Sequence, residues 1–115
     1  MMSEQEVDIS NTPKGKKYDF GKPDTTLLLD FSEALKEVCR VGEFGCEKYD
    51  RGNWKYVEDG IRRYTAALLR HTIEDDDATN YNITDDESGF LHASHAAWCA
   101  LARLELILQK EKNYE

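Results

Sequence analysis

Three histidines, His71, His92 and His95, stand close together in the sequence and are all the histidines of the chain. Imidazole titrates near neutral pH, so it can accept or donate a proton during catalysis. It also binds transition-metal ions. His92 and His95 are three positions apart, which puts both rings on one face if their segment is helical. The grouping therefore predicts that the imidazoles act together, in proton transfer or as metal ligands.

A purely structural explanation stays open for these histidines. His71 can be a buried, hydrogen-bonded side chain, and the other two can lie at the edge of a crowded helix. A structural zinc site fits the sequence less well. Cys99 is the one cysteine that accompanies the histidines, and the CxxC spacing of such sites is absent.

Acidic side chains form a second group of candidate ligands. Glu33 and Glu37 are four positions apart, and Asp85 and Glu87 shortly precede the last two histidines. Magnesium prefers oxygen ligands and is commonly shared with substrate phosphates, and it can lower the pKa of an attacking water. These four carboxylates are therefore candidate magnesium ligands. The alternative is solvated helix faces, because 23 of the 115 residues are Asp or Glu.

Basic and aromatic side chains form a third group. Lys17 and Lys22 flank a short loop, KYDFGK, whose composition resembles a phosphate-binding loop although the GxxxxGK pattern is absent. Lys48 and Arg70 add positive charge, while Tyr49 and Trp54 offer ring faces for a nucleobase. The alternative is a basic tail with two aromatic rings at the edge of the core.

Three long helices are expected to position these groups, over about residues 28–49, 56–73 and 89–112. In each, apolar residues recur at spacings of three and four, and no segment has the alternation of a strand. The sequence predicts an all-α small helical bundle at residues 17–112, after a flexible N-terminal tail at residues 1–16. Three helices make a thin bundle, which dimerisation or helix exchange would complete.

The composition excludes several classes of protein. A formal net charge of −8 argues against a general nucleic-acid binder, which needs a basic face. No apolar run approaches the roughly 18–20 residues that cross a membrane, and the N-terminus lacks a segment of signal-peptide type. Three cysteines without framework spacing indicate reduced thiols. We expect a cytoplasmic protein that binds neither nucleic acid nor a membrane.

Four motifs in a fixed order carry a family resemblance that covers about residues 16–108. They are KxDxGKP from Lys17, GxxKYxxxNW from Gly45, YxxALLRH from Tyr64, and DxESGxxHxxHAAW from Asp85. Together they resemble dATP/dGTP diphosphohydrolase-like proteins, many of them from bacteriophages. That group is related to the MazG-type all-α NTP pyrophosphohydrolases.

The resemblance implies a MazG-like helical bundle that forms a homo-oligomer, a dimer or a tetramer. It also implies hydrolysis of a purine nucleoside triphosphate, dATP or dGTP, to the monophosphate and pyrophosphate. The reaction would depend on Mg²⁺, with Mn²⁺ as the other candidate, in the host cytoplasm if a phage encodes the protein. The alternative is a phage protein that binds and sequesters a nucleotide without hydrolysing it, as an anti-defence function.

The resemblance also suggests roles for single residues. His92 or His95 would orient the attacking water or act as base. Glu87 and His71 are the other two candidates for catalytic residues. The MazG metal motifs, EExxE and ExxD, are absent in clean form, so the metal ligands Glu33, Glu37, Asp85 and Glu87 rest on local chemistry. The candidates for substrate binding are Lys17, Asp19, Lys22, Lys48, Tyr49, Asn53, Trp54 and Arg70.

Overall fold

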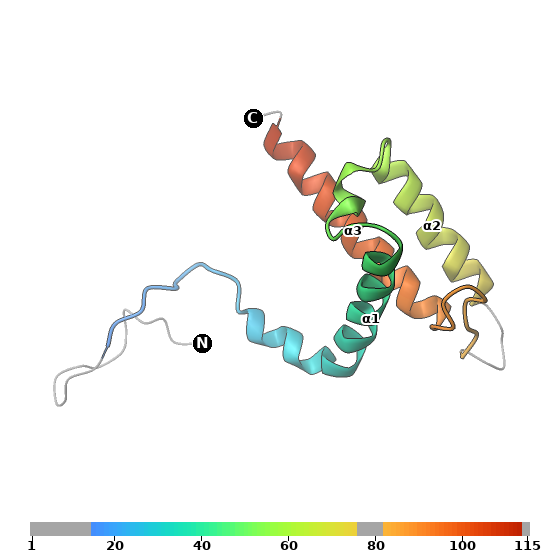
Figure 1. Cartoon of the computed structure of the whole chain (residues 1–115). Helices are drawn as coiled ribbons and strands as arrows, with labels where there is room; N and C mark the ends of the chain where they lie inside the picture. Colours follow the sequence, from blue (N-terminus) through green and yellow to red (C-terminus); the bar gives the residue numbers. More distant parts are fainter. Residues whose placement is uncertain (1–14, 76–81, 114–115) are drawn as a thin grey trace. The chain divides into compact units, whose positions relative to one another are not determined.

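The computed structural model describes residues 15–75 and 82–113 (Figure 1). The chain divides into two units between Asp30 and Phe31. Residues 1–14 lie outside the described residues, and most of the predicted N-terminal tail falls there. The elements are η2 (Thr25–Phe31), α1 (Ser32–Lys48), η3 (Asn53–Tyr56), α2 (Gly60–Glu74) and α3 (His92–Asn113), where η denotes a 3-10 helix.

The prediction of an all-α bundle with three long helices is confirmed for the described residues. The completion of the bundle by oligomerisation stays a prediction. All three helices begin later than expected. The residues before α1 form the 3-10 helix η2, and those before α2 form η3. Asp59 then takes a left-handed conformation (φ 55°), which separates η3 from the first turn of α2.

The third helix begins at His92, three residues after the expected Gly89. Gly89 has φ 77°, a left-handed conformation that glycine adopts without steric cost and that a helix cannot contain. An isolated antiparallel bridge between Thr84 and Leu91 then closes the loop before the helix. The loop at residues 82–91 is thus an ordered turn that ends directly before α3.

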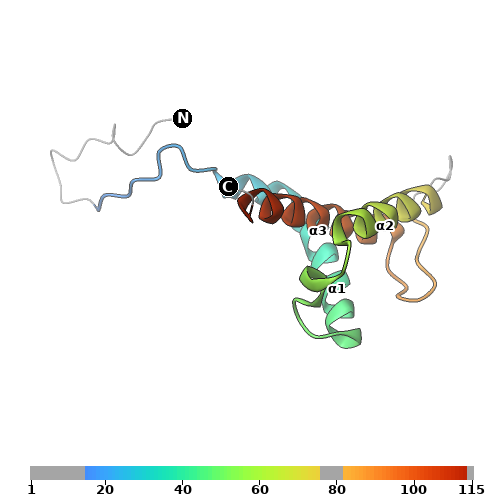
Figure 2. The same ribbon diagram turned by 90° about the horizontal axis from the view of Figure 1, so that it is seen from above.

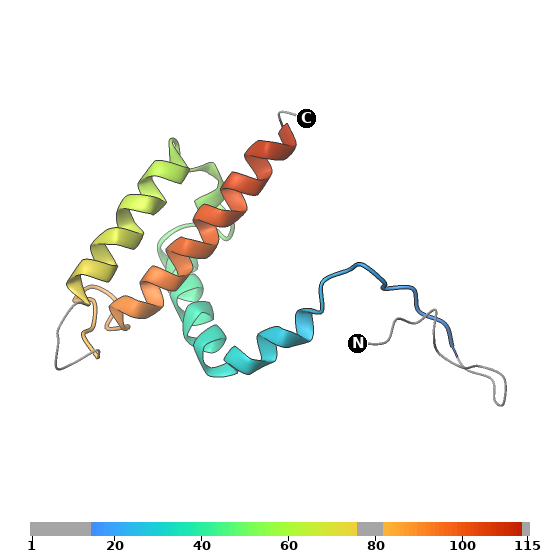
Figure 3. The ribbon, with the colours of Figure 1, turned by 180° about the vertical axis from the view of Figure 1, so that it is seen from behind.

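Helices α2 and α3 lie side by side and run in opposite directions (Figures 1 and 3). Near one end of the pair, Gly60 faces Leu106. In the middle, the guanidinium Nε of Arg103 donates a hydrogen bond of 2.7 Å to Thr65 Oγ1. Near the other end, His71 meets the start of α3. This antiparallel pairing brings the end of α2 to the start of α3.

Helix α1 crosses α3 instead of running along it (Figures 1 and 2). At the crossing, Gly42 lies against the indole of Trp98. Two residues further along α1, the ring of Phe44 meets that of Phe90 edge to face, with centroids 6.1 Å apart. The crossing therefore brings the end of α1 to the loop that precedes α3.

The core of the second unit follows α3 and is small. Its most buried apolar side chains are Cys99 and Ala102 on α3, with Val38 and Val41 of α1. No described side chain is completely enclosed. Among the described helices, none combines the length and the apolar character needed to span a membrane.

The three cysteines give a direct test of this packing. Cys39 and Cys46 are exposed on α1, whereas Cys99 is buried and burial raises the pKa of its thiol to about 11. Because the thiolate is the reactive species, DTNB should label Cys39 and Cys46 rapidly in the folded chain. Cys99 should react only after unfolding. Rapid labelling of all three in the native protein would contradict the packing of α3.

Candidate functional site

The loop before α3 is held in place by its own backbone. The amide of Asp85 donates to the carbonyl of Phe90 (2.7 Å), and the amide of Gly89 donates to the carbonyl of Asp85 (2.8 Å). The amide of His92 donates to the carbonyl of Ile83 (2.9 Å), which ties the start of α3 to the start of the loop. The side chains of this turn therefore have defined positions beside the first turn of α3.

Ser88 connects the loop to His95. Its amide donates to Asp85 Oδ2 (2.9 Å), and its hydroxyl oxygen accepts the amide of Phe90 (3.1 Å). The same oxygen lies 2.7 Å from His95 Nε2. When His95 is neutral, the serine hydroxyl can donate to Nε2, which leaves the imidazole proton on Nδ1. Asp85 Oδ2 is 4.0 Å from the same nitrogen, so a carboxylate stands beside this pair.

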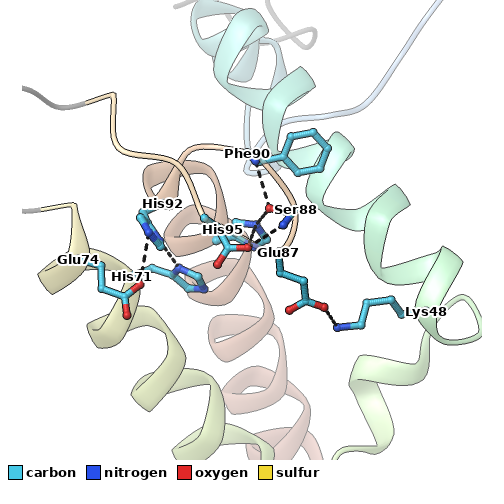
Figure 4. A network of polar contacts seen from close by, with 9 residues as sticks. Lys48, His71, Glu74, Glu87, Ser88, Phe90, His92 and His95 are labelled. Carbon is cyan, nitrogen blue, oxygen red and sulfur yellow. Dashed lines mark hydrogen bonds and ion pairs between the residues drawn. The ribbon is translucent and has the colours of Figure 1, made fainter.

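The three imidazoles meet where α2 ends and α3 begins (Figure 4). His71 Nδ1 lies 2.8 Å from His92 Nδ1, and His92 Nε2 lies 3.3 Å from Glu74 Oε2. The ring of His71 stacks on that of His95, with centroids 4.8 Å apart and an interplanar angle of 13°. His92 is only 6% exposed. The cluster is therefore a partly buried, connected group, as the sequence predicted for these three residues.

Burial affects the protonation of two of the imidazoles. It lowers the pKa of both His71 and His95, and neighbouring imidazoles lower these values further. Burial by itself would raise the pKa of Asp85, but the hydrogen bonds from Ser88, helped by the nearby imidazoles, hold that pKa below its usual value. At neutral pH the unprotonated forms of His71 and His95 are therefore favoured beside an ionised carboxylate.

In metal-free protein we expect the free energy of unfolding to decrease as the pH falls from about 7.5 to about 5.5. His71 and His95 have folded-state pKa values below the ordinary 6.5, so in this range the unfolded chain binds more protons than the folded one. Each such protonation favours unfolding, and the loss begins as the pH drops through the ordinary value. Urea titrations in EDTA measure it, and His95→Gln should reduce it. A stability independent of pH would contradict the burial of these rings.

Glu87 and Lys48 form a second contact next to the imidazoles. The ammonium group of Lys48 pairs with Glu87 Oε1 (Figure 4), and this pair raises the pKa of Lys48. The same ammonium lies 5.6 Å from the ring centroids of Phe44 and Tyr49. A catalytic candidate and a substrate-binding candidate thus neutralise each other in this structure. Their predicted roles stay predictions.

The predicted carboxylate ligands of α1 have local partners. Glu33 lies 3.5 Å from the ammonium of Lys36, and Glu37 lies 3.2 Å from Nε of Arg40. Both are i,i+3 pairs on the surface of one helix, a common use of acidic residues in helices. Neither belongs to the group of side chains whose spacing suits a metal ion, so their role as ligands stays a prediction.

The remaining substrate-binding candidates are spread over both units. Lys17, Asp19 and Lys22 are exposed in the first unit, where the amide of Lys22 donates to the carbonyl of Asp19 (3.0 Å). In the second unit Asn53 and Arg70 are exposed. The structure therefore leaves the roles of these five residues untested.

Trp54 lies in a different, apolar environment. Its indole meets that of Trp98 edge to face, with centroids 6.4 Å apart. The two rings, with Leu101 and Leu104, line a shallow apolar pocket against α3. A role of Trp54 in binding a nucleobase stays a prediction.

Glu74 is a member of the site that the sequence reasoning did not identify. Among the described residues, His71, Glu74 and His92 each offer one ligand atom, and these atoms lie within 4.8 Å of one another. A signal was present, because Glu74 follows His71 by three positions on one helix and so shares its face. Glu74 was missed because it is the first residue of the acidic run EDDD, which looks like the start of a polar linker after the helix. The group is compatible with a divalent metal ion.

The structure thus defines a helical domain with an imidazole–carboxylate cluster next to the turn DDESG. The family of N-terminal domains of dATP/dGTP diphosphohydrolases matches residues 12–115. The chain belongs to this family, which confirms the resemblance found in the sequence. The cluster, the turn and all three helices lie within the matched region.

The dATP/dGTP diphosphohydrolase of Salmonella phage PMBT28 is 37% identical to the chain over 84 residues. The aligned part is 72% of this chain but 26% of the phage protein. The chain therefore spans about a quarter of the length of this curated relative. No solved structure matches the chain significantly.

Proposed function

We propose that this domain takes part in the hydrolysis of a purine deoxynucleoside triphosphate, dATP or dGTP, to the monophosphate and pyrophosphate. The family and the name of the phage relative support this substrate class. The observation that carries the proposal is the contact between Ser88 and His95 beside the ionised Asp85. A neutral imidazole of lowered pKa, oriented by a hydroxyl group, is suited to accept a proton from water near neutral pH.

In the proposed reaction Ser88 passes the proton of the attacking water to His95. The water gives a proton to Ser88 Oγ while the serine proton moves to His95 Nε2, 2.7 Å away. The resulting hydroxide attacks the α-phosphorus, and the bond from that phosphorus to the bridging α–β oxygen breaks. Pyrophosphate leaves with the bond electrons. Asp85 stabilises the imidazolium that forms, since its carboxylate lies 4.0 Å from the protonated nitrogen.

Positive charge for the phosphates would come from Lys48 and Arg70. Lys48 is held by Glu87, so an incoming triphosphate would have to replace that carboxylate as its partner. The expected magnesium would accompany the triphosphate, which supplies the oxygen atoms that this ion prefers. The His71–Glu74–His92 group offers two nitrogens and one carboxylate, which does not fit a dedicated magnesium site.

The test is a substrate screen on the purified chain. Each dNTP and NTP is incubated with Mg²⁺ or Mn²⁺, and the products are identified by chromatography. Conversion of dGTP or dATP to the monophosphate and pyrophosphate is the expected result. If no nucleotide is cleaved, the proposal that this chain hydrolyses a nucleotide is wrong.

The second candidate, a nucleotide-binding domain without hydrolysis, is favoured by one observation. The chain spans 26% of its phage relative, so catalysis can reside in the remainder of such proteins. Calorimetry in EDTA separates the two. Tight binding of a nucleotide that survives chelation and returns unchanged supports binding alone, whereas turnover rejects it.

A further inference from the structure

We propose that His71, Glu74 and His92 form a binding site for a transition-metal ion of the Mn²⁺, Co²⁺ or Zn²⁺ type. The site would be distinct from any magnesium that accompanies a nucleotide. It does not depend on the proposed hydrolysis, because it rests on the donor atoms and their spacing.

The spacing suits a single ion. Ligand atoms about 2.1 Å from a metal and next to each other in its coordination sphere lie about 3.0–3.4 Å apart. His92 Nε2 and Glu74 Oε2 are 3.3 Å apart, and one atom from each of the three residues lies within 4.8 Å of the others. A movement of His71 toward the other two side chains would complete a three-ligand arrangement.

The scaffold holds these ligands in advance. His71 and Glu74 lie three positions apart in the last turns of α2, so they share a face. His92 is the first residue of α3, and its amide is bonded to the carbonyl of Ile83. The antiparallel packing of α2 and α3 brings these two helix ends together (Figure 4). Ordering the ligands therefore costs little conformational entropy on binding.

The surroundings favour an ion with open coordination positions. The side chain of His92 is 8% exposed, whereas that of Glu74 is 55% exposed. One side of the group is therefore enclosed and the other reaches solvent. Three protein ligands with an accessible side are typical of metal sites that also bind water or a substrate. The ring of His95, stacked on His71, would support the orientation of that ligand without contacting the ion.

The donor types determine the class of ion. Two imidazole nitrogens and one carboxylate suit Mn²⁺, Co²⁺ and Zn²⁺, whereas magnesium is bound through oxygen atoms and retains most of its water. The 2.8 Å contact between the two Nδ1 atoms is a hydrogen bond only if one of them carries a lone pair. A lone pair on nitrogen is also what a metal ion requires.

The experiment is calorimetry of the chain with each metal ion alone, without nucleotide. The chain is stripped with EDTA and dialysed, and Cys39 and Cys46 are alkylated first so that the exposed thiols cannot bind zinc. We expect one Zn²⁺ or Co²⁺ per chain and at least a hundred-fold weaker binding of Mg²⁺, about 2.7 kcal/mol. Absence of binding by both transition metals, or equal binding of Mg²⁺, would overturn the proposal.

Two variants of matched chemistry assign the site. Glu74→Gln should weaken zinc binding at least ten-fold, while Glu47→Gln, an equally conservative change at an exposed carboxylate of α1, should leave it unchanged. Glu74 is exposed, so its replacement should not unfold the chain, and circular dichroism checks this. Unchanged affinity in Glu74→Gln, or an equal loss in both variants, would place the metal elsewhere. Since no nucleotide is present, the result is independent of whether the chain hydrolyses dGTP.

Discussion

His95→Gln is expected to lower the turnover of dGTP by about 10²- to 10⁴-fold, the usual contribution of a general base. Glutamine keeps a polar group near Ser88 but cannot accept the proton that leaves the attacking water. The loss should appear in kcat, with little change in KM, because the imidazole is assigned to the reaction and not to holding the substrate. Steady-state kinetics on the purified variant measures both parameters.

Ser88→Ala is the companion variant for this prediction. Ser88 contacts His95 through the 2.7 Å distance between its oxygen and Nε2, and in the proposed reaction it passes the proton. Its loss should lower kcat less than His95→Gln, since water can replace a hydroxyl group. The acidic limb of the pH–rate profile should also shift, because the imidazole loses its hydrogen-bond partner. A His95→Gln variant with near wild-type kcat would remove the base from the mechanism.

Gly42→Ala is expected to destabilise the fold by about 1–3 kcal/mol, the usual cost of overfilling a packed core. A Cβ atom at position 42 would lie 2.7 Å from Cζ3 and 3.1 Å from Cη2 of the Trp98 indole. The first distance is too short for two carbon atoms and the second is tight, so either the indole of Trp98 or α1 would have to shift. The free energy of unfolding from urea titrations measures the effect.

Gly45→Ala is the matched control, three residues further along the same helix. Apart from its immediate neighbours, no described atom lies within 4 Å of a Cβ placed there. Alanine is favoured over glycine within a helix by about 0.5–1 kcal/mol, so this variant should gain stability. The same substitution should thus have opposite signs at the two positions. Equal effects of the two variants would mean that α1 does not cross α3 at Trp98.

The helical architecture could be predicted from the sequence because the apolar periodicity of each helix is strong. The starts of the helices could not. Asp59 and Gly89 take left-handed conformations that end the local continuity of the chain, and the Thr84–Leu91 bridge closes the loop before α3. Such turns depend on contacts between residues several positions apart, which periodicity does not describe.

The histidine cluster could be predicted from the sequence only in part. His92 and His95 share a face because of their spacing, a consequence of helix geometry alone. Their meeting with His71 depends on the antiparallel packing of α2 against α3, and in the sequence only the grouping of all three histidines in one stretch indicated it. For the same reason Glu74 was missed, since its position beside His92 exists only after the helices pack.

The sequence by itself therefore predicted the helices and the family, and it named candidate side chains for proton transfer and cation binding whose roles stay predictions. Only the tertiary structure decided how those groups pair. Lys48 meets Glu87, Ser88 meets His95, and His92 bridges His71 and Glu74 across two helices. The physical reason is that helix formation depends on neighbours within one turn. A site made from two helix ends and a loop depends on the burial that brings them together.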